Sequence, residues 1–347
     1  MRNSPGPLLR RATVGVLALA TFWTSATAPA SAAEAERLPF TERYRATQHG
    51  GIVRAANTSV SCRTTAPGCA SARRGAVAAN GDFDMFYVDV DRDPNTYNSS
   101  RAEVRLPAGA RVTYARLYWG GNLRVGEQKP PVDNGRVLVA EPGGAYKEVL
   151  ADTVVGHRVA HGADAFQASA DVTDLVRDSG AGLYTVAQVN VAMGRSAAGA
   201  WGGWTLVAAY ERAAEPLRRL SVWDGFASLD GRRGLRLPGP RLPEGSAGYA
   251  GLVAYNGDRG RTGDSLTVSG AALSDAANPR DDVLNSTISG AAGARVPSYA
   301  HTLGYDSDVY DLGAAPRRRG DQSGSRLVAR RESAWAGVLF TAVDARD

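Results

Sequence analysis

The chain has 347 residues, of which 44% are hydrophobic and 22% charged, with 40 Gly, 17 Pro and 2 Cys. This length and apolar content exclude a disordered or collagen-like chain, and two cysteines exclude a small disulfide-stapled domain. Arg2, Arg10 and Arg11 lie in an apparent export signal, and subtracting them from the 40 basic residues leaves 37 against 35 acidic residues. The charge therefore does not indicate a nucleic-acid partner.

Residues 1–32 have the three parts of a signal peptide: the arginines just named, an apolar run over 14–23, and small residues at 30–32. The sequence predicts cleavage before Ala33 and secretion of the mature chain. The apolar run is much shorter than the ~20 residues that cross a bilayer, and no later segment is long and apolar enough. We therefore expect an extracellular protein without a membrane span after cleavage.

Cys62 and Cys69 are separated by six residues rich in Thr, Pro and Gly. In an exported chain this spacing favours a local disulfide over two free thiols. In the chain-entropy model such a short loop contributes about 2–3 kcal/mol. The bridge is therefore expected to fasten one loop rather than the whole fold.

Apolar and polar residues alternate with period two in many short segments bounded by Gly, Pro, Asn and Asp, a pattern typical of strands. The predicted strands cover residues 82–88, 102–106, 112–119, 135–140, 183–193, 204–211, 220–226, 249–255, 265–268 and 335–343. One helix is predicted over 172–177, with Asp171 as its N-cap and Gly180 after its end. These elements predict an all-β fold: an antiparallel β-sandwich or jelly roll, possibly two packed sandwiches, with one short helix near 172–179.

A domain seam is predicted near Glu215 and Pro216, which divides the mature chain into residues 33–215 and 216–347. The sequence leaves open whether these halves are two sandwiches or one continuous domain. Residues 230–248 are rich in Gly, Pro and Arg, lack periodicity, and are expected to form a long exposed loop.

Several segments that follow one another along the chain carry a family resemblance. They are 87–91 (YVDVD), 98–100 (NSS), 106–110 (LPAGA), 115–121 (ARLYWGG), 171–176 (DVTDLV), 203–207 (GWTLV), 224–226 (DGF), 263–264 (GD) and 303–308 (LGYDSD). This succession resembles a β-rich module of exported bacterial surface and adhesin-like proteins of actinobacterial type. The resemblance covers about residues 50–343.

The resemblance implies a location and an architecture but no assigned chemistry. In many members the module precedes repeated immunoglobulin-like domains. This chain stops after the module, which favours a freely secreted form over attachment to the cell wall.

Two groups of oxygen-bearing side chains are candidate calcium ligands. Asp89, Asp91, Asp93 and Asn95 recur at every second residue, and Asp306 and Asp308 repeat the pattern near the C-terminus. Calcium takes six to eight oxygen ligands, which such side chains supply when a loop brings them together. The first group is not an EF-hand, because Pro94 and Ser100 occupy the positions that require Gly and Glu. The alternative is the wet face of a strand that runs into an Asx-rich turn.

Two short motifs suggest catalysis or metal binding but lack the partners that these need. Residues 263–266 spell GDSL, the nucleophile block of an esterase family, yet the block lies late and His301 has no acid at the required offset. A turn leading into a strand is the better interpretation. His157 and His161 have zinc-like spacing, but Arg158 stands where a metalloprotease has its Glu. No catalytic residue is therefore predicted.

Each tryptophan of the mature chain lies in or beside an apolar strand, where core packing is the commoner outcome. Trp201, which lies among Gly and Ala, is the one candidate for a surface ring that stacks on a ligand. The chain is thus interpreted as an extracellular adhesion or polymer-binding module. Expected partners are a cell-wall or extracellular polysaccharide or another surface protein. A structural component of the cell envelope and a secreted hydrolase remain alternatives, and calcium is the one candidate cofactor.

Overall fold

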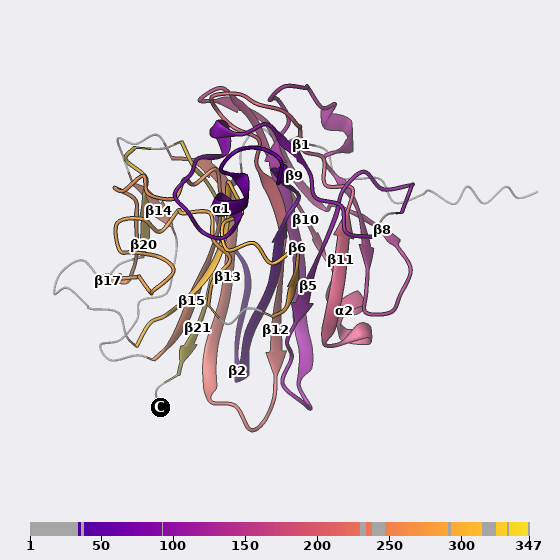
Figure 1. Ribbon diagram of the computed structural model, residues 1–347. Coiled ribbons are helices and arrows are strands. Elements are labelled where there is room, and N and C mark those ends of the chain that lie inside the picture. Colours follow the sequence, from indigo (N-terminus) through magenta and orange to yellow (C-terminus); the bar gives the residue numbers. More distant parts are fainter. Residues whose placement is uncertain are drawn as a thin grey trace, which may run out of the picture. The chain divides into compact units, whose positions relative to one another are not determined.

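Strands recur from one end of the described chain to the other, as the alternating pattern predicts (Figure 1). The computed structural model describes residues 34–35, 38–91, 93–229, 234–237, 247–290, 293–313, 324–331 and 333–345. All of them belong to one compact unit, Ser31–Asp347. The predicted signal peptide, residues 1–32, lies outside the described residues.

The largest sheet in this part of the chain has ten strands. They are β1 (Glu34–Ala35), β9 (Thr153–Ala160), β10 (Ala163–Asp171), β6 (Arg111–Asn122), β12 (Gly202–Glu211), β2 (Leu38–Thr58), β13 (Leu217–Ser228), β21 (Trp335–Asp344), β15 (Gly248–Tyr255) and β19 (Tyr305–Asp311), in spatial order. Among the described strands only β1 and β9 pair in parallel; the other pairs are antiparallel.

Three smaller sheets accompany it. The first contains β18 (Arg295–Val296), β5 (Ser99–Val104), β11 (Gly182–Ala187), β7 (Arg136–Ala140) and β8 (Lys147–Leu150). The second contains β14 (Leu235–Leu237), β20 (Ser325–Val328), β16 (Ser265–Val268) and β17 (Ala271–Ala272), and the third pairs β3 (Val60–Cys62) with β4 (Met85–Tyr87).

Strand β2 turns the ten-stranded sheet into two facing layers. Its first part pairs with β13, up to His49 opposite Leu217, and its second part pairs with β12, from Gly50 opposite Glu211. A Cβ atom on Gly50 would lie 1.9 Å from the carbonyl oxygen of Tyr210, so only glycine fits where the strand passes between layers. The two halves of the sheet thus pack face to face as a sandwich.

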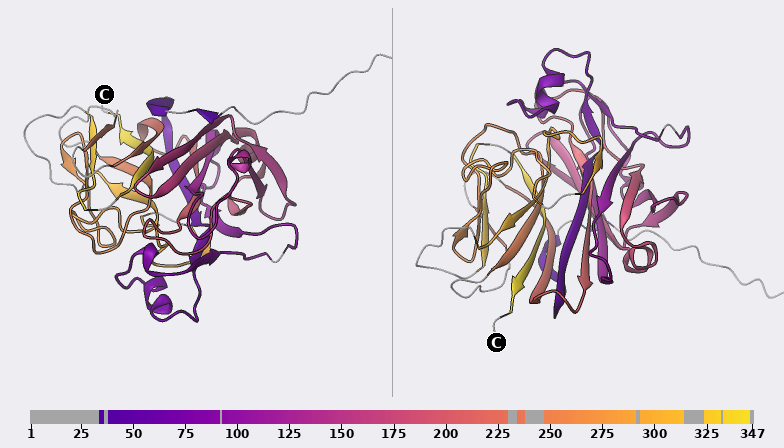
Figure 2. Two further views of the ribbon diagram at one scale, coloured as in Figure 1. Left: turned by 90° about the horizontal axis from the view of Figure 1, so that it is seen from above. Right: turned by 60° about the horizontal axis from the view of Figure 1, so that its bottom comes forward.

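The five-stranded and the four-stranded sheets cover the two outer faces of this sandwich, which gives four layers and three apolar cores in the described residues (Figures 1 and 2). The middle core joins residues such as Val207 of β12 and Phe340 of β21. A second core lies between β12 and the β5–β11–β7 sheet, and a third between β15 and the β16–β20 sheet. The all-β, antiparallel sandwich prediction is confirmed.

The helices are short. The predicted helix is α2, Thr173–Ser179, and it ends at Gly180 in the left-handed region (φ 70°). Its N-cap is Val172 rather than Asp171, whose Oδ1 instead accepts the N–H of Thr173 at 2.9 Å. The sequence did not predict α1 (Cys69–Arg73) or the 3-10 turns η1 (Asn80–Asp82) and η2 (Pro131–Asp133). No helix in the described residues is long and apolar enough to cross a membrane.

Several boundaries differ from prediction. Strand β2 was missed because polar residues and a Gly pair interrupt its alternation, and β19 because aspartates and tyrosines made it resemble a loop. The seam at Glu215 falls in the turn between β12 and β13, both of which pair with β2. Within 230–248, β14 pairs with β20, whereas residues 230–233 and 238–246 lie outside the described residues.

Candidate functional site

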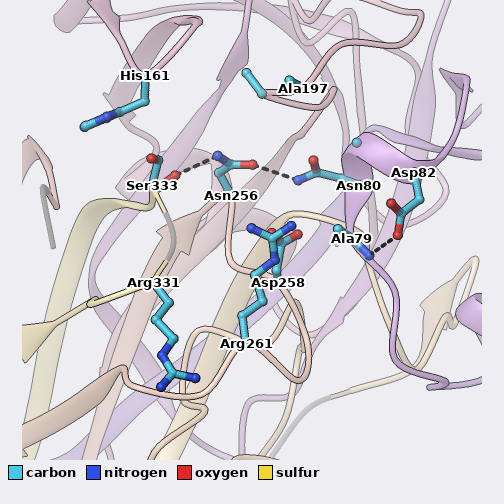
Figure 3. Close-up of a pocket in the computed structure, with 12 residues that line it drawn as sticks. Ala79, Asn80, Asp82, His161, Ala197, Asn256, Asp258, Arg261, Arg331 and Ser333 are labelled. Atoms are coloured by element: carbon cyan, nitrogen blue, oxygen red, sulfur yellow. Dashed lines mark hydrogen bonds and ion pairs between the residues drawn. The ribbon is translucent and has the colours of Figure 1, made fainter.

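A polar pocket of about 260 Å³ lies where five separate chain segments meet (Figure 3). The residues that line it are Ala79, Asn80, Gly81, Asp82, His161, Ala197, Ala198, Asn256, Asp258, Arg261, Arg331 and Ser333. Its side chains therefore come mostly from turns and loops at strand ends, the usual location of binding residues on a rigid β scaffold.

Two asparagines tie opposite walls of the pocket together. Asn80 Nδ2 donates to Asn256 Oδ1 at 2.7 Å, and Asn256 Nδ2 donates to the carbonyl oxygen of Ser333 at 2.6 Å (Figure 3). Asn256 has φ 62°, a left-handed conformation that asparagine tolerates better than most residues. This chain of amides keeps three segments in fixed positions.

The charges that line the pocket balance. Asp82 accepts the backbone N–H of Ala79 at 2.9 Å, and Arg261 Nε lies 3.2 Å from Asp258 Oδ2. Burial raises the pKa of Asp258, and the positive charge of Arg261 opposes that rise. Arg331 is exposed and provides a second guanidinium group. Two carboxylates and two guanidinium groups thus share one small cavity.

The Cys62–Cys69 disulfide forms as predicted, with Cα atoms 5.8 Å apart. It closes the loop that leads into α1. Beyond the bridge, Arg73 donates to Ser61 Oγ at 3.0 Å and lies over the ring of Tyr299, with its guanidinium carbon 4.4 Å from the ring centre.

The segment that follows α1 is tied to the pocket wall. Arg259 donates to the carbonyl oxygen of Gly75 at 2.9 Å, and Ala300 N–H donates to that of Arg73 at 2.9 Å. These contacts fasten the segment that carries Asn80 and Asp82 toward the pocket. The disulfide thus lies on the same tethered stretch of chain as the pocket residues Asn80 and Asp82.

The GDSL segment does not form a catalytic site with His301. Ser265 begins strand β16 in the outer sheet, so residues 263–266 lead into a strand as predicted. His301 is buried against the segment after α1, with Nδ1 3.1 Å from the carbonyl oxygen of Ala76. Burial lowers its pKa to about 4, which keeps the ring neutral at pH 7.

The first predicted calcium group is a set of Asx turns. Asp91 Oδ1 accepts the N–H of Asp93 at 2.9 Å, and Asp93 Oδ1 accepts the N–H of Asn95 at 2.9 Å. Ser99 Oγ donates to Asp89 Oδ1 at 2.7 Å, and the Tyr146 hydroxyl donates to Asp91. Donors within the chain thus occupy these carboxylates, and the geometry gives the calcium prediction no support here.

The second group, Asp306 and Asp308, lies in β19 rather than in a loop, and both residues are fully buried. They face the segment 284–289, which covers that side of the strand through hydrogen bonds from Thr287 and Ser289. In the described part of the chain, no group of three or more His, Cys, Asp or Glu side chains is arranged to hold a metal. A metal here would need neutral oxygens as well.

Two other predicted ligand positions fail or fall outside what is described. The expectation that Trp201 is a surface ring is wrong: its side chain is fully buried, packed against Tyr255 with ring centres 5.8 Å apart. The small neighbours that suggested exposure instead make room for close sheet packing. His161 lies in the turn between β9 and β10 and lines the polar pocket, whereas the side chain of His157 is outside the described residues.

A larger groove of about 650 Å³ lies beside the turn of β2 between the layers. Its lining includes Arg54, Tyr249, Asp275, Gly290 and Tyr310. The Tyr249 hydroxyl is held by the backbone of Ile52, at 2.7 Å from its nitrogen and 2.9 Å from its oxygen. Tyr310 belongs to the same strand as Asp306 and Asp308, which are themselves fully buried and do not line the groove.

Comparisons with known proteins add little. A chain from the atomic structure of Sulfolobus turreted icosahedral virus shares 10% identity, with a TM-score of 0.21 over 85% of this chain and 91% of that chain. No protein-family model matches, and no curated protein matches. A TM-score this low carries no argument, so the fold assignment rests on the strands themselves.

Sequence reasoning missed most of the polar pocket. Asn80, Asn256 and Arg261 form no motif, since each segment contributes only one to four side chains. A weak signal existed in the turn residues around Asn256, but nothing local indicated which distant segments would face it.

Proposed function

We propose that this chain is an exported, extracellular binding module whose polar pocket takes one unit of a hydroxyl-rich polymer, a cell-wall or extracellular polysaccharide. The observation that carries the proposal is the convergence of amide, carboxylate and guanidinium groups from five segments in one cavity. A few placed polar groups on a rigid scaffold are what a specific small-ligand site requires.

The balance of charge supports a neutral ligand. Asp82 and Asp258 offset Arg261 and Arg331, so neither an anion nor a cation is favoured by net charge. A sugar hydroxyl both donates and accepts hydrogen bonds, which suits a lining that offers both kinds of group. No Trp, Tyr or Phe is among the described residues that line the pocket, so recognition would rest on hydrogen bonds rather than ring stacking.

The extracellular location is supported by the signal peptide predicted over residues 1–32 and by the Cys62–Cys69 bridge. Disulfides persist in oxidising compartments and are rare in the cytosol. The resemblance to exported surface modules is consistent with a role in adhesion.

The test is binding of the secreted, processed protein to purified cell-wall and extracellular polysaccharides by pull-down and calorimetry. Arg331→Ala removes an exposed guanidinium from the pocket and should weaken binding at least about tenfold, a loss of roughly 1.4 kcal/mol. Its neighbour Arg330 is exposed but does not line the pocket, so Arg330→Ala is the matched control. Equal binding by both variants would remove the pocket from the proposal.

One observation favours a second candidate, a polysaccharide hydrolase. Asp82 and Asp258 line the same cavity, and burial raises the pKa of Asp258, as a general acid requires. Release of reducing ends from a bound polysaccharide, lost in Asp258→Asn and in Asp82→Asn, would support hydrolysis. Binding without any release supports the binding module alone.

A further inference from the structure

One face of β19 buries three oxygen-bearing side chains. Asp306, Asp308 and Tyr310 alternate along the strand and so point to the same side, where Tyr310 joins the third apolar core. Their exposed fractions are 0%, 0% and 1%. Carboxylates are almost never buried this completely unless a partner compensates their charge.

Three of the five side-chain oxygens on this face have no hydrogen-bond partner in the described residues. Asp306 Oδ1 accepts the N–H of Thr287 at 3.1 Å, and Asp308 Oδ1 accepts that of Ser289 at 2.9 Å. The Oδ2 atoms of both aspartates and the Tyr310 hydroxyl are buried without a hydrogen bond. Asp264 Oδ1 is also buried and unpartnered, at the start of β16.

One residue links the two carboxylates. The N–H of Thr287 donates to Asp306 Oδ1 at 3.1 Å, and the Thr287 hydroxyl lies 3.0 Å from Asp308 Oδ1. Both carboxylates therefore lie around Thr287.

Around the hydroxyl of Thr287 there are more hydrogen-bond acceptors than donors. Thr287 Oγ1 lies 2.8 Å from Asn278 Oδ1, 2.9 Å from Asn285 Oδ1 and 3.0 Å from Asp308 Oδ1. One hydroxyl has one hydrogen and satisfies only one of these three acceptors.

The amide orientations are held by other contacts. Asn278 Nδ2 donates to Ser289 Oγ at 2.6 Å, and Asn285 Nδ2 donates to the carbonyl oxygen of Ala277 at 2.8 Å. Both amide oxygens therefore face Thr287. Together with Asp308 Oδ1 they are three acceptors for a single hydroxyl hydrogen.

A backbone carbonyl points to the same region. A Cβ atom on Gly257 would lie 2.6 Å from Asp306 Oδ2 and 2.2 Å from the carbonyl oxygen of Leu284. Glycine lets this backbone approach the carboxylate closely, and both oxygens lie beside it.

We propose that Asp306, Asp308, Asn278, Asn285 and Thr287 form a buried site for one calcium ion. All of these groups offer oxygen, the ligand atom that calcium prefers, in the mixture of carboxylates and carbonyls that its flexible coordination accepts. Asn278 Oδ1, Asn285 Oδ1 and Asp308 Oδ1 each lie about 3 Å from Thr287 Oγ1, a separation that neighbouring oxygens also have when they share an ion at roughly 2.3–2.6 Å.

Other cations fit less well. Cys and His, which favour zinc, are absent from this set of ligands, and magnesium demands a tighter octahedron and retains its water. Arg54 and Arg295 are the positive groups whose charges act on Asp308, so the protein compensates part of the negative charge. No positive group is among the main influences on Asp306, and the ion would supply that compensation.

The groove beside β2 comes close to the site. Tyr310 and Asp275 line this groove, and Asp275 Oδ1 accepts the N–H of Asn278 at 2.9 Å. Asp306 and Asp308 themselves are fully buried, so an ion bound between them is shielded from water. The inference does not depend on the ligand of the polar pocket, although the 256–258 segment borders both sites.

The test uses the secreted protein stripped with EGTA and titrated with calcium chloride or magnesium chloride. We expect calorimetry to find one calcium ion bound per chain at this site. The thermal midpoint should rise with calcium and much less with magnesium. At free calcium a hundred times the dissociation constant, the folding equilibrium should shift about 100-fold. Terbium should bind in place of calcium and emit after excitation of Tyr310.

Variants locate the ion. Asp308→Asn and Asp306→Asn keep the side-chain shape and should abolish the response, whereas Asp311→Asn, an exposed aspartate of the same strand, should retain it. Should the buried variants not fold, Asn285→Ala, which removes one amide oxygen, takes their place and should weaken binding at least tenfold.

Two outcomes would overturn the proposal. A wild-type protein indifferent to calcium up to 10 mM would mean that protons on the buried carboxyls, not a metal, satisfy the excess oxygens. A response that survives in Asp308→Asn but disappears in Asp91→Asn would place the ion in the Asx-turn loop instead.

Discussion

Asp89–Asp93 and Asp306–Asp308 are two runs in which aspartate occupies every second residue, yet they lie in opposite environments. In the first run, every aspartate side chain accepts a hydrogen bond from a donor within ten residues in the chain. In the second run, each buried aspartate has one oxygen without a partner. The first run ends a strand at the surface, and the second lies inside a strand between two sheets.

The difference shows that burial, and not the sequence repeat, decides whether an aspartate needs a proton or a cation as a partner. A carboxylate in a surface turn is solvated and makes local hydrogen bonds, so it needs no counter-ion. The same carboxylate between two sheets loses its water and must find a proton or a cation. The following predictions test this contrast, from the largest expected effect to the smallest.

The largest effect is expected for Asp308→Ala in calcium buffer. The change leaves the buried N–H of Ser289 without its acceptor, and it removes a proposed ligand. We expect the free energy of unfolding to fall by about 2–4 kcal/mol, measured by urea denaturation. A loss of stability as small as that of Asp91→Ala would show that burial does not distinguish the two aspartate runs.

Removing the disulfide changes neither aspartate run, so it gives a reference value for a loss of stability that is independent of both. The double variant Cys62→Ser with Cys69→Ser should lose about 2–3 kcal/mol of stability, because the unfolded chain regains the freedom of a short loop. Since the segment after α1 carries Asn80 and Asp82, polysaccharide binding should weaken while the calcium response persists. Unchanged polysaccharide binding would show that the bridge does not organise the polar pocket.

In EGTA, acidification should increase the stability that Asp308 contributes and, at lower pH, decrease the stability that Asp91 contributes. Burial raises the pKa of Asp308 to about 6, so the folded protein takes up a proton there before the unfolded chain does. Its contribution to stability is therefore gained as the pH falls from 7 toward 5, with a slope of up to about 1.4 kcal/mol per pH unit. The difference between wild type and Asp308→Asn isolates this slope, because His301, which loses stability in the same range, is present in both.

Asp91 has the reverse sign. Partial burial raises its pKa, but hydrogen bonds from Tyr146 and from the N–H of Asp93 outweigh burial and the net shift is downward. Its stabilisation is present above the ordinary value of 3.8 and is lost only as the pH falls through the lower folded value. Melts of wild type and Asp91→Asn should therefore run parallel from pH 7 to pH 5. Curves that diverge in this range would contradict the surface assignment.

The smallest effect is expected for Asp91→Ala at pH 7. The side chain is partly exposed, and water replaces the acceptor that Tyr146, Thr96 and Asp93 lose. We expect a loss of about 1 kcal/mol or less by urea denaturation, equal with calcium and with EGTA. A loss that appears only in calcium would show that this loop also binds the ion.

Local patterns were sufficient for some features of this protein. The period-two alternation at residues 112–119 predicted β6 as a strand, although most of β6 is buried on both faces. Cys62 and Cys69 are close in sequence, so their pairing needed no knowledge of the fold. Gly180 marked the end of α2 because glycine adopts the left-handed conformation that ends helices.

Tertiary structure alone decided the rest. Strand β2 belongs to both layers because the chain turns at Gly50, and Trp201 is buried because Tyr255 packs over it. Asp306 and Asp308 became unusual only when the 284–289 segment covered them, and Asn80 met Asn256 across 176 positions of sequence. Burial and long-range contact depend on which faces the sheets bring together, and no local pattern of residues encodes that choice.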